Sequence, residues 1–353
     1  MKALKRETII REDLIDNRFI AEVNKFKSFL TDLKFRLDQF DSKNSSHEQT
    51  EKMLDERKKQ NFGTIKRFFD QVWDIVKNLD KNDYAIYQAY FQKNILPLVG
   101  NAEVNKHIYI KPLGYSGDFI TMNYIFDYHD KFIGKTSFEK LINNLTCSIP
   151  ISLSNIARKE FLKGQILRVL TEKGANAKIA SIASGSAREV LELLNDNSIN
   201  VPVKYIFFDF ENKALEYIKN GLNKVDQRAK VNFDASFIND NVINIIRKPA
   251  IREKLQGQDL IYAFGIYDYL SDIVAKKLTS ALFGCLKSGG TLVVCNASVD
   301  KTDFRAYFEF LGEWNMIYRT KEEMMGWTDK FPSKQVAIRD NPDEAYLYLI
   351  IKK

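Results

Sequence analysis

Cysteine and histidine are both scarce in this sequence. Its 353 residues include only three of each, widely separated along the chain: Cys147, Cys285, Cys295, His47, His107 and His129. This spacing supports neither a disulfide framework nor a cluster of metal ligands, so we expect no metal site. Unpaired thiols are typical of a reducing compartment, and we expect a cytoplasmic protein.

Long apolar stretches are absent as well. The first 13 residues are rich in charge and lack the apolar core of a signal peptide. No run approaches the roughly 20 apolar residues that cross a membrane. With 45% hydrophobic and 28% charged residues, the composition is that of a globular protein, and the length favours two domains. We therefore expect a soluble protein without a membrane span.

The sequence also lacks a block of like charge. Its net charge is +7 and its pI is near 9.0. The lysines nevertheless alternate with Asp, Glu and Asn along the whole chain instead of forming one basic patch. We therefore expect no nucleic-acid partner.

The first part of the chain carries its apolar residues at helical spacing. Between residues 15 and 98 they recur every three or four positions, as in Phe19, Val23, Phe26, Leu30, Leu33, Phe35 and Leu37. The polar residues 41–50 predict a loop between the first two helices, and a further helix is expected over 152–171. Such a stripe most often forms a packed core. We predict a helical domain over residues 1–150 that covers the substrate.

The pattern changes in residues 151–353, which we predict to form an α/β domain. Short apolar runs of strand length, 179–183, 205–208, 260–264 and 291–294, alternate with helical segments. This alternation implies a parallel sheet with helices on both faces. Residues 334–339 and 345–352 are joined by four turn-forming residues and predict a hairpin that adds an antiparallel strand.

Small residues follow the first predicted strand. Ser181, Ala183 and Gly185 form a turn before the helix that starts near Arg188. A dinucleotide fingerprint needs three glycines here to approach a pyrophosphate, and only one is present. A nucleoside without phosphates needs fewer backbone donors. The turn therefore favours S-adenosylmethionine over a nicotinamide dinucleotide, which is the main rival.

An acidic residue closes the second predicted strand. Asp209 lies 24 residues after Gly185 (209 minus 185) and is followed by Phe210. A carboxylate at this position can accept hydrogen bonds from both ribose hydroxyls, so we assign Asp209 and Phe210 to the cofactor site. The alternative is that Asp209 only caps the helix beginning at Asn212.

The next two strands also end in candidate site residues. Asp234 and Ala235 are expected after the third strand, where Asp234 would accept from the adenine amino group; the alternative is an ordinary turn aspartate. Gly265, Tyr267 and Asp268 follow the fourth strand and are expected to face the crevice where cofactor and substrate meet. A tight turn over 286–290 is expected to introduce the fifth strand.

One conspicuous segment lies outside the predicted sheet. The run Lys-Pro-Leu-Gly-Tyr-Ser-Gly-Asp, residues 111–118, can form a tight loop that presents its backbone and Tyr115 to a ligand. The alternative is a turn whose Asp118 caps the following helix. We include Tyr115 and Asp118 among the candidate cofactor-binding residues.

The ordered set Gly185, Asp209, Asp268 and Gly289 resembles class I S-adenosylmethionine-dependent methyltransferases over about residues 175–353. This resemblance implies a Rossmann-like sheet of seven strands, mostly parallel with one antiparallel strand. Over about residues 90–353 the chain also resembles a bacterial family of extracellular-factor 3-hydroxypalmitic acid methyl ester biosynthesis proteins. The matching segments are residues 111–118, 184–190, 265–270, 304–309 and 314–320, whereas Ala183 replaces a usual glycine.

The resemblance implies S-adenosylmethionine as cofactor and a small-molecule or fatty-acid substrate. For a carboxylate acceptor, Tyr115, Tyr267 and Arg305 would orient the substrate, because an ionised oxygen needs no base. For a hydroxyl or amine acceptor, Asp268 or His107 would act as base. Arg305 is alternatively a surface arginine on a helix, and His107 a loop histidine.

Three functions are compatible with these residues. The first is O-methylation of a small molecule or 3-hydroxy fatty acid. The second is N- or C-methylation of another metabolite, and the third is a binding protein that has kept the fold and lost catalysis. The sequence determines neither the oligomeric state nor the identity of the acceptor.

Overall fold

The computed structural model describes residues 11–43, 46–225, 233–301, 304–332 and 335–353. It divides into two compact units, which are Met1–Leu153 with Asp303–Asn315, and Ser154–Thr302 with Met316–Lys353. The sequence had suggested a single division after residue 150. The structure differs in the segment 303–315, which belongs with the N-terminal helices. Within the described residues no helix has the length and apolar character needed to span a membrane.

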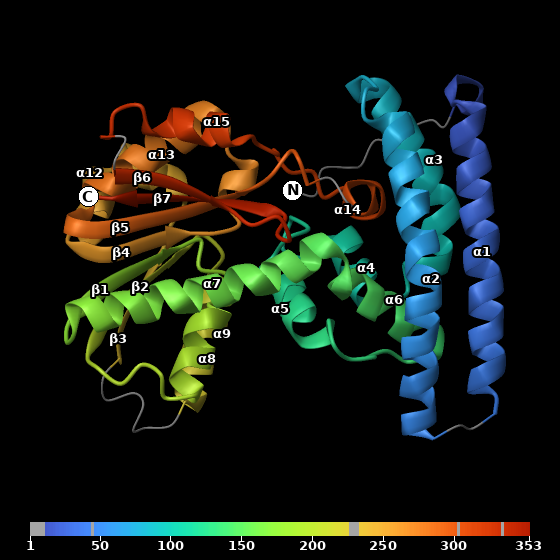
Figure 1. Cartoon of the computed structure of the whole chain (residues 1–353), viewed down its shortest axis with the longest axis horizontal. Helices are drawn as coiled ribbons and strands as arrows, with labels where there is room; N and C mark the ends of the chain where they lie inside the picture. The colour runs from blue at the N-terminus through green and yellow to red at the C-terminus, as the bar shows by residue number, and fades with distance from the viewer. Residues whose placement is uncertain (1–10, 44–45, 226–232, 302–303, 333–334) are drawn as a thin grey trace. The chain divides into compact units, whose positions relative to one another are not determined.

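The first unit is helical. Its elements are η1 (Glu12–Leu14), α1 (Asn17–Asp41), α2 (His47–Val76), α3 (Lys81–Val99), α4 (Glu103–Ile110), α5 (Phe119–Tyr128), α6 (Ser137–Ser148) and α14 (Arg305–Gly312). Helices α1, α2 and α3 run alongside one another (Figure 1). The predicted loop at 41–50 is shorter than expected, because Ser46 and Gln49 form a capping box that starts α2 at His47.

The apolar stripe of α1 forms part of this unit's core, as its spacing predicts. Its buried residues are Phe19, Val23, Phe26, Leu30, Leu33 and Leu37. Phe35 was included in the predicted stripe, but it is 60% exposed because it lies off the i, i+4, i+7 face. Phe26 stacks on Phe68 of α2, with 3.8 Å between ring centroids. Aromatic packing therefore adds to the aliphatic contacts between α1 and α2.

The second unit is built on a seven-stranded sheet. Its strands are β1 (Ala177–Ile182), β2 (Val203–Asp209), β3 (Phe233–Asn239), β4 (Gln258–Ala263), β5 (Leu286–Ala297), β6 (Val336–Asp340) and β7 (Tyr346–Lys352). The strand order is β3-β2-β1-β4-β5-β7-β6, and β7 is antiparallel to both of its neighbours. The predicted sheet of seven mostly parallel strands with one antiparallel strand is confirmed, and so is the predicted terminal hairpin.

Helices cover both faces of this sheet (Figure 1). One face packs on α11 (Val242–Arg247), α12 (Pro249–Lys254) and α13 (Asp272–Gly284). The other packs on α7 (Pro150–Lys173), α8 (Arg188–Asn195) and α9 (Asn212–Lys224). Alternate residues of β1 point to opposite faces, Ile179 to the α7 side and Ile182 to the α13 side. Short elements η2 (Tyr267–Tyr269), α15 (Lys321–Met325) and η3 (Gly326–Thr328) complete the unit.

The expected tight turn before the fifth strand is instead an irregularity within β5. Gln258 pairs with Leu286, but Leu260 pairs with Thr291, so four residues of β5 are looped out of the ladder. Gly290 is needed there because a Cβ would lie 2.8 Å from the carbonyl oxygen of Gln258. The glycine pair therefore bends a long strand rather than beginning a short one.

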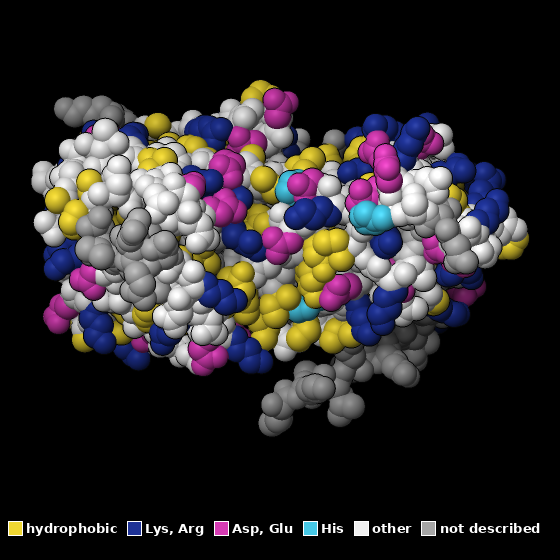
Figure 2. Space-filling view, turned by 90° about the horizontal axis from the view of Figure 1, so that it is seen from below, with side chains coloured by type: hydrophobic (Ala, Val, Ile, Leu, Met, Phe, Trp, Pro, Cys, Tyr) yellow, Lys and Arg dark blue, Asp and Glu magenta, His cyan; other side chains and the backbone are white. Residues whose placement is uncertain are grey.

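Charged side chains are mixed on the surface. In the view of Figure 2, Lys and Arg side chains lie singly or in small groups among Asp and Glu side chains. This distribution agrees with the alternation of charges along the sequence.

Candidate cofactor and active site

The turn after β1 is tightly bound to the end of β2. The Ser184 backbone N–H donates to the carbonyl oxygen of Phe208 at 3.2 Å, and the Gly185 N–H donates to Asp209 Oδ2 at 2.9 Å. Gly185 has φ +55°, and Ala183 and Ala187 have φ +54° and +44°. A left-handed alanine costs about 1–2 kcal/mol. The protein maintains a strained, narrow turn at the carboxyl edge of the sheet, where such folds bind ligands.

Asp209 is the centre of this arrangement. Its carboxylate is 4% exposed and accepts from the backbone N–H groups of Gly185 and Glu211, both at 2.9 Å. Burial raises the pKa of Asp209, while these backbone hydrogen bonds oppose the shift. The N-cap of α9 is Glu211, whose side chain accepts from the Lys213 N–H. The alternative that Asp209 only caps this helix is therefore wrong.

The residues beside Asp209 provide an open aromatic surface. Phe210 is 50% exposed, although it directly follows a buried strand. From the end of β3, the Asn239 side-chain amide donates to the carbonyl oxygens of Asp209 and Phe210 at 3.0 and 2.9 Å. The Asp240 N–H donates to the same Asp209 carbonyl at 3.1 Å. The carboxyl ends of β2 and β3 are thus joined beside Phe210.

Asp234 and Ala235 do not belong to this edge. They were expected to follow the third strand, but β3 begins at Phe233, and they pair with Lys204 and Tyr205 near the start of β2. In a parallel sheet this places them at the amino end, away from the turn at Gly185. Their predicted position after the third strand is wrong, and with it the reason for assigning both residues to the adenine site. Asp240 occupies the position expected for Asp234, and the polar run 239–241 after Phe237 and Ile238 is the signal that identifies it.

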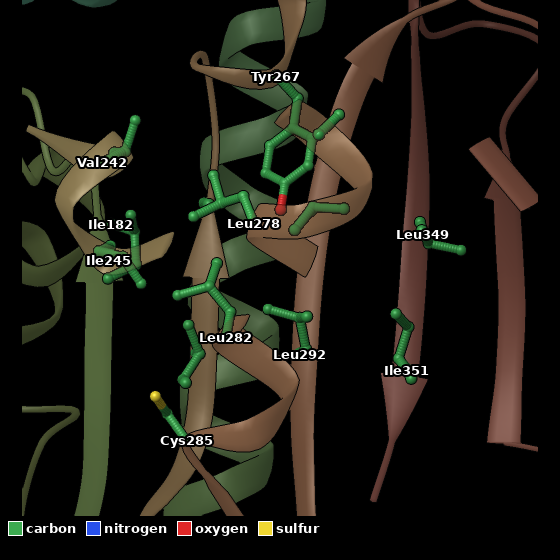
Figure 3. Close-up of a cluster of buried hydrophobic side chains, with 14 of the residues drawn as sticks. Ile182, Val242, Ile245, Tyr267, Leu278, Leu282, Cys285, Leu292, Leu349 and Ile351 are labelled. Carbon is green, nitrogen blue, oxygen red and sulfur yellow. The ribbon is translucent and has the colours of Figure 1, made fainter. Parts of the chain in front are cut away.

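Gly265 follows the fourth strand, and its φ of +80° favours a residue without a Cβ. Tyr267 follows in η2 but does not face a crevice. Figure 3 shows its ring among the buried side chains around Leu278 and Leu292. Its hydroxyl lies 3.1 Å from Thr279 Oγ1, and its exposed fraction is 0%. The prediction that Tyr267 faces the crevice is wrong, whereas Tyr269, two residues later, is 39% exposed.

Asp268 joins the ends of β4 and β5. Its Oδ1 accepts from the Ala297 N–H at 2.7 Å, and its carbonyl oxygen accepts from the Ile317 N–H at 2.7 Å. Burial raises the pKa of Asp268, while the hydrogen bond from Ala297 and the positive charges of Arg158 and Arg319 oppose the shift. A carboxylate held in this way stabilises the loop, and its predicted role as a base stays a prediction.

Arg319 fixes the same loop and was not among the predicted site residues. It is 1% exposed, pairs with Asp272 at 2.8 Å and donates to the carbonyl oxygens of Tyr267 and Leu270 and to Asn296 Oδ1. Thr320, next in the chain, forms a capping box with Glu323 that begins α15. The end of the matching segment 314–320 therefore stabilises the loop after β4 through Arg319.

A buried polar chain lies beneath the turn after β1. The Tyr262 hydroxyl donates to Glu189 Oε1 at 2.6 Å and lies 2.6 Å from the Tyr205 hydroxyl. Burial raises the pKa of Tyr262, and Ser181, which is buried beside this chain, has a smaller lowering effect on it. Burial raises the pKa of Glu189, which lies in the first turn of α8. These residues connect β1, β2, β4 and α8 below the candidate site.

The Gly-Tyr-Ser-Gly-Asp loop belongs to the first unit. Asp118 is fully buried, caps α5 by accepting from the Ile120 and Thr121 N–H groups, and lies 2.8 Å from His107 Nε2. The alternative stated for this loop, a turn that caps the following helix, is confirmed. Tyr115 is half-buried. The roles of Tyr115 and Asp118 toward the cofactor, and of His107 as base, stay predictions.

Arg305 also belongs to the first unit. Its Nε donates to Glu309 Oε1 at 2.6 Å, and its guanidinium lies 4.4 Å from the ring of Trp73 in α2. Glu309 accepts as well from the hydroxyl of Tyr84 in α3. Arg305 and Glu309 therefore attach α14 to α2 and α3. The contact of Arg305 with a substrate carboxylate stays a prediction.

The core of the first unit encloses a small apolar cavity of about 20 Å³. Its lining is almost entirely aliphatic and aromatic, and includes Phe62, Ile65, Phe69, Leu145 and Phe304. A cavity of this size accommodates about one small apolar group. A long acyl chain would enter only if side chains such as Phe62 moved.

The residues at the carboxyl edge of the second unit suit S-adenosylmethionine. A ribose diol could donate to the Asp209 carboxylate. Each of its two oxygens accepts from one backbone N–H and can accept a further hydrogen bond. An adenine would find the exposed Phe210. The narrow turn at Gly185 lacks the glycines that a pyrophosphate would need. The donor and acceptor set therefore fits the nucleoside end of this cofactor.

No family model matches this sequence, and no curated protein matches it. Among solved structures, a possible exported protein of Bordetella parapertussis is 18% identical, with a TM-score of 0.57 over 75% of this chain and 88% of that one. An O-methyltransferase family protein of Burkholderia thailandensis is 12% identical, with a TM-score of 0.42 over 76% and 70%. Magnesium protoporphyrin IX methyltransferase of Synechocystis PCC 6803, solved with bound S-adenosylmethionine, is 8% identical, with a TM-score of 0.39 over 56% and 81%. At these identities the first structure supports the fold, and the other two add no further argument.

Proposed function

We propose that this chain is an S-adenosylmethionine-dependent methyltransferase. The observation that carries the proposal is the position of Asp209, a buried carboxylate bound to the Gly185 turn at the carboxyl edge of a sheet with the order β3-β2-β1-β4-β5-β7-β6. The turn has only one of the three glycines that favour a pyrophosphate, and the carboxylate can accept hydrogen bonds from a ribose. A nucleoside cofactor without phosphates satisfies both conditions.

The acceptor that we propose is a carboxylate oxygen of a small molecule, with 3-hydroxy fatty acids as the first class to test. A carboxylate is ionised at neutral pH and needs no base. This suits the second unit, because Asp268 is buried and held by the Ala297 N–H rather than freely available. The sequence resemblance supports a fatty acid.

S-adenosylmethionine, when bound, supplies an electrophilic methyl group. The protein's own contribution is to hold the reactants. Asp209 would fix the ribose, and Phe210 would cover the adenine. The loop after β4, fixed by Asp268 and Arg319, would keep the reacting edge rigid and exclude water. Holding two reactants in line accelerates transfer mainly through proximity and orientation.

Replacing Asp209 tests the cofactor site. Asp209→Ala should weaken S-adenosylmethionine binding by about 100-fold, because two charge-assisted hydrogen bonds to the ribose are lost. Titration calorimetry measures this, with thermal unfolding as a check that the variant folds. If it does not fold, Asp209→Asn serves instead, since it keeps one side-chain oxygen.

Asp234→Ala is the matched control, since it removes an aspartate at the amino end of the neighbouring strand. Its affinity should stay within about twofold of the original. Unchanged affinity in Asp209→Ala would refute the site.

Transfer from tritium-labelled cofactor tests the acceptor. We expect labelled methyl ester when 3-hydroxy fatty acids are supplied, and none when the same acids are already esterified. Absence of labelled ester with retained cofactor binding would reject the fatty-acid carboxylate. Label in other compounds of a broad metabolite extract would then identify the acceptor class, and absence of any label would indicate a binding protein.

A further inference from the structure

A buried arginine from α7 lies at the same edge of the sheet as Asp209. The Arg158 guanidinium lies 4.6 Å from the ring of Tyr346 at the start of β7 and 6.0 Å from that of Phe264. Its Nη1 lies 3.9 Å from the sulfur of Cys295, near the end of β5. These three residues mark the carboxyl ends of β4 and β5. Arg158 is only 9% exposed, although it carries a full charge.

Gly265 leaves the space beside this guanidinium open. A Cβ placed on Gly265 would lie 3.8 and 4.0 Å from the two terminal nitrogens of Arg158. The glycine has φ +80°, so the chain turns sharply there without a side chain. The guanidinium therefore lies directly over the turn that ends β4, on the ligand-binding edge of the sheet.

The groups around Arg158 stabilise its positive charge. Asp268 and Glu189, two buried carboxylates, interact electrostatically with it. Tyr346 presents the face of its ring, which favours a cation. A buried charge is costly unless other groups compensate for it. An anionic ligand at this edge would add a planar, two-point partner of the kind that guanidinium groups bind best.

We propose that Arg158 binds the carboxylate of the amino-acid end of S-adenosylmethionine. The inference rests on the proposed function and deepens it, because Asp209 would recognise the ribose and Arg158 the opposite end of the same molecule. Arg158 is thus a binding and positioning residue. It would set the direction of the sulfonium relative to the loop after β4.

Binding of three ligands distinguishes this role from general support of the fold. S-adenosylmethionine has both the nucleoside end and the complete amino-acid end. Decarboxylated S-adenosylmethionine keeps the sulfonium and the amine but lacks the carboxylate, and 5′-methylthioadenosine lacks the whole amino-acid end. Titration calorimetry on the full chain should show that Arg158→Met weakens S-adenosylmethionine about 10–100-fold. Affinity for the other two ligands should change less than about twofold.

Arg252→Met is the matched control. Arg252 is also partly buried and donates to the carbonyl oxygens of Ile245 and Ile246 in α11. Its loss should leave all three affinities within about twofold. Equal weakening of all three ligands in Arg158→Met, or of none, would overturn the proposal.

The unaltered protein provides a test that does not depend on how the variant folds. It should bind decarboxylated S-adenosylmethionine about 10–100-fold more weakly than S-adenosylmethionine. Equal affinities would overturn the role of Arg158 and leave the proposed function standing. If the unaltered protein bound none of the three ligands, the proposed function and this inference would both fall.

Discussion

Tyr267 illustrates how one side chain differs from its neighbours in the same loop. Its ring packs 5.2 Å from that of Trp327 and within the core around Leu278, while Tyr269 is partly exposed. The Tyr267 hydroxyl meets only the hydroxyl of Thr279 among the hydrogen bonds described for it. Its position is therefore that of a residue that stabilises the loop from inside.

We expect Tyr267→Phe to lower the free energy of unfolding by about 1 kcal/mol, the net value of one hydrogen bond. Tyr267→Ala should cost about 3–5 kcal/mol, because a large cavity is created in the core. Denaturant unfolding measures both. Cofactor affinity should remain within about twofold in Tyr267→Phe. A variant with unchanged stability and weakened binding would instead place Tyr267 in the site.

The residues whose positions the sequence predicted well are those that directly follow an unbroken apolar strand. Gly185 and Asp209 follow clear apolar strands, so their position at the carboxyl edge follows from the strands themselves. Asp234 was misplaced because β3 has only partly buried or exposed residues and no unbroken apolar run to mark where it begins. The direction of Tyr267 depends on packing against α13 and against Trp327, which lies 60 positions later in the sequence (327 minus 267), so it could not be derived from the loop residues alone.

At the level of elements, the start of α2 is determined by the capping residues and not by where the polar run ends. The polar residues 41–50 suggested a long loop, but four of them, from His47 on, already belong to α2 because Ser46 caps it. The glycine pair before β5 suggested a turn, but a bulge accommodates it. A polar or glycine-rich run in the sequence indicates a local irregularity. Whether a helix or strand ends at that run is decided by the hydrogen bonds that form around it.

Two helical glycines of the first unit should respond in opposite ways to alanine. A Cβ on Gly312 would lie 2.3 Å from Ile108 Cγ2 in α4, and Ile108 is buried. Gly63, in the middle of α2, has nothing within 4 Å. Gly312→Ala should therefore destabilise the protein by about 1–3 kcal/mol through overpacking. Gly63→Ala should stabilise it by about 1 kcal/mol through helix propensity.

Denaturant unfolding of the two variants, made in the same full-length protein, measures the difference. The comparison is controlled for residue type, because both changes add one methyl group to a helix. Equal effects of the two substitutions would contradict the close approach of α14 to α4.

At the scale of the whole chain, the sequence suggested two successive domains, whereas the structure assigns 303–315 to the helical unit. This segment carries Phe304, Tyr307, Phe310 and Leu311, all buried. Phe310 packs against Phe19, Tyr84 and Phe91, and Tyr307 packs against Phe69. Such pairing joins residues more than 200 positions apart in sequence, which local periodicity cannot reveal.

A fragment ending at Leu153 should therefore fail to form a stable unit. It would lose the burial of four large side chains from the segment 304–311, each contributing about 1.5–3 kcal/mol, which together equal most of a typical domain's stability of about 5–15 kcal/mol. Near-ultraviolet circular dichroism and denaturant unfolding should show helical content without a cooperative transition. In this fragment, the absence of α14 exposes the apolar residues that α14 covers in the full chain. Adding a peptide of residues 303–315 should cover them again and restore cooperative unfolding. A fragment that unfolds cooperatively on its own, with stability unaffected by the peptide, would show that the helical unit is complete without α14.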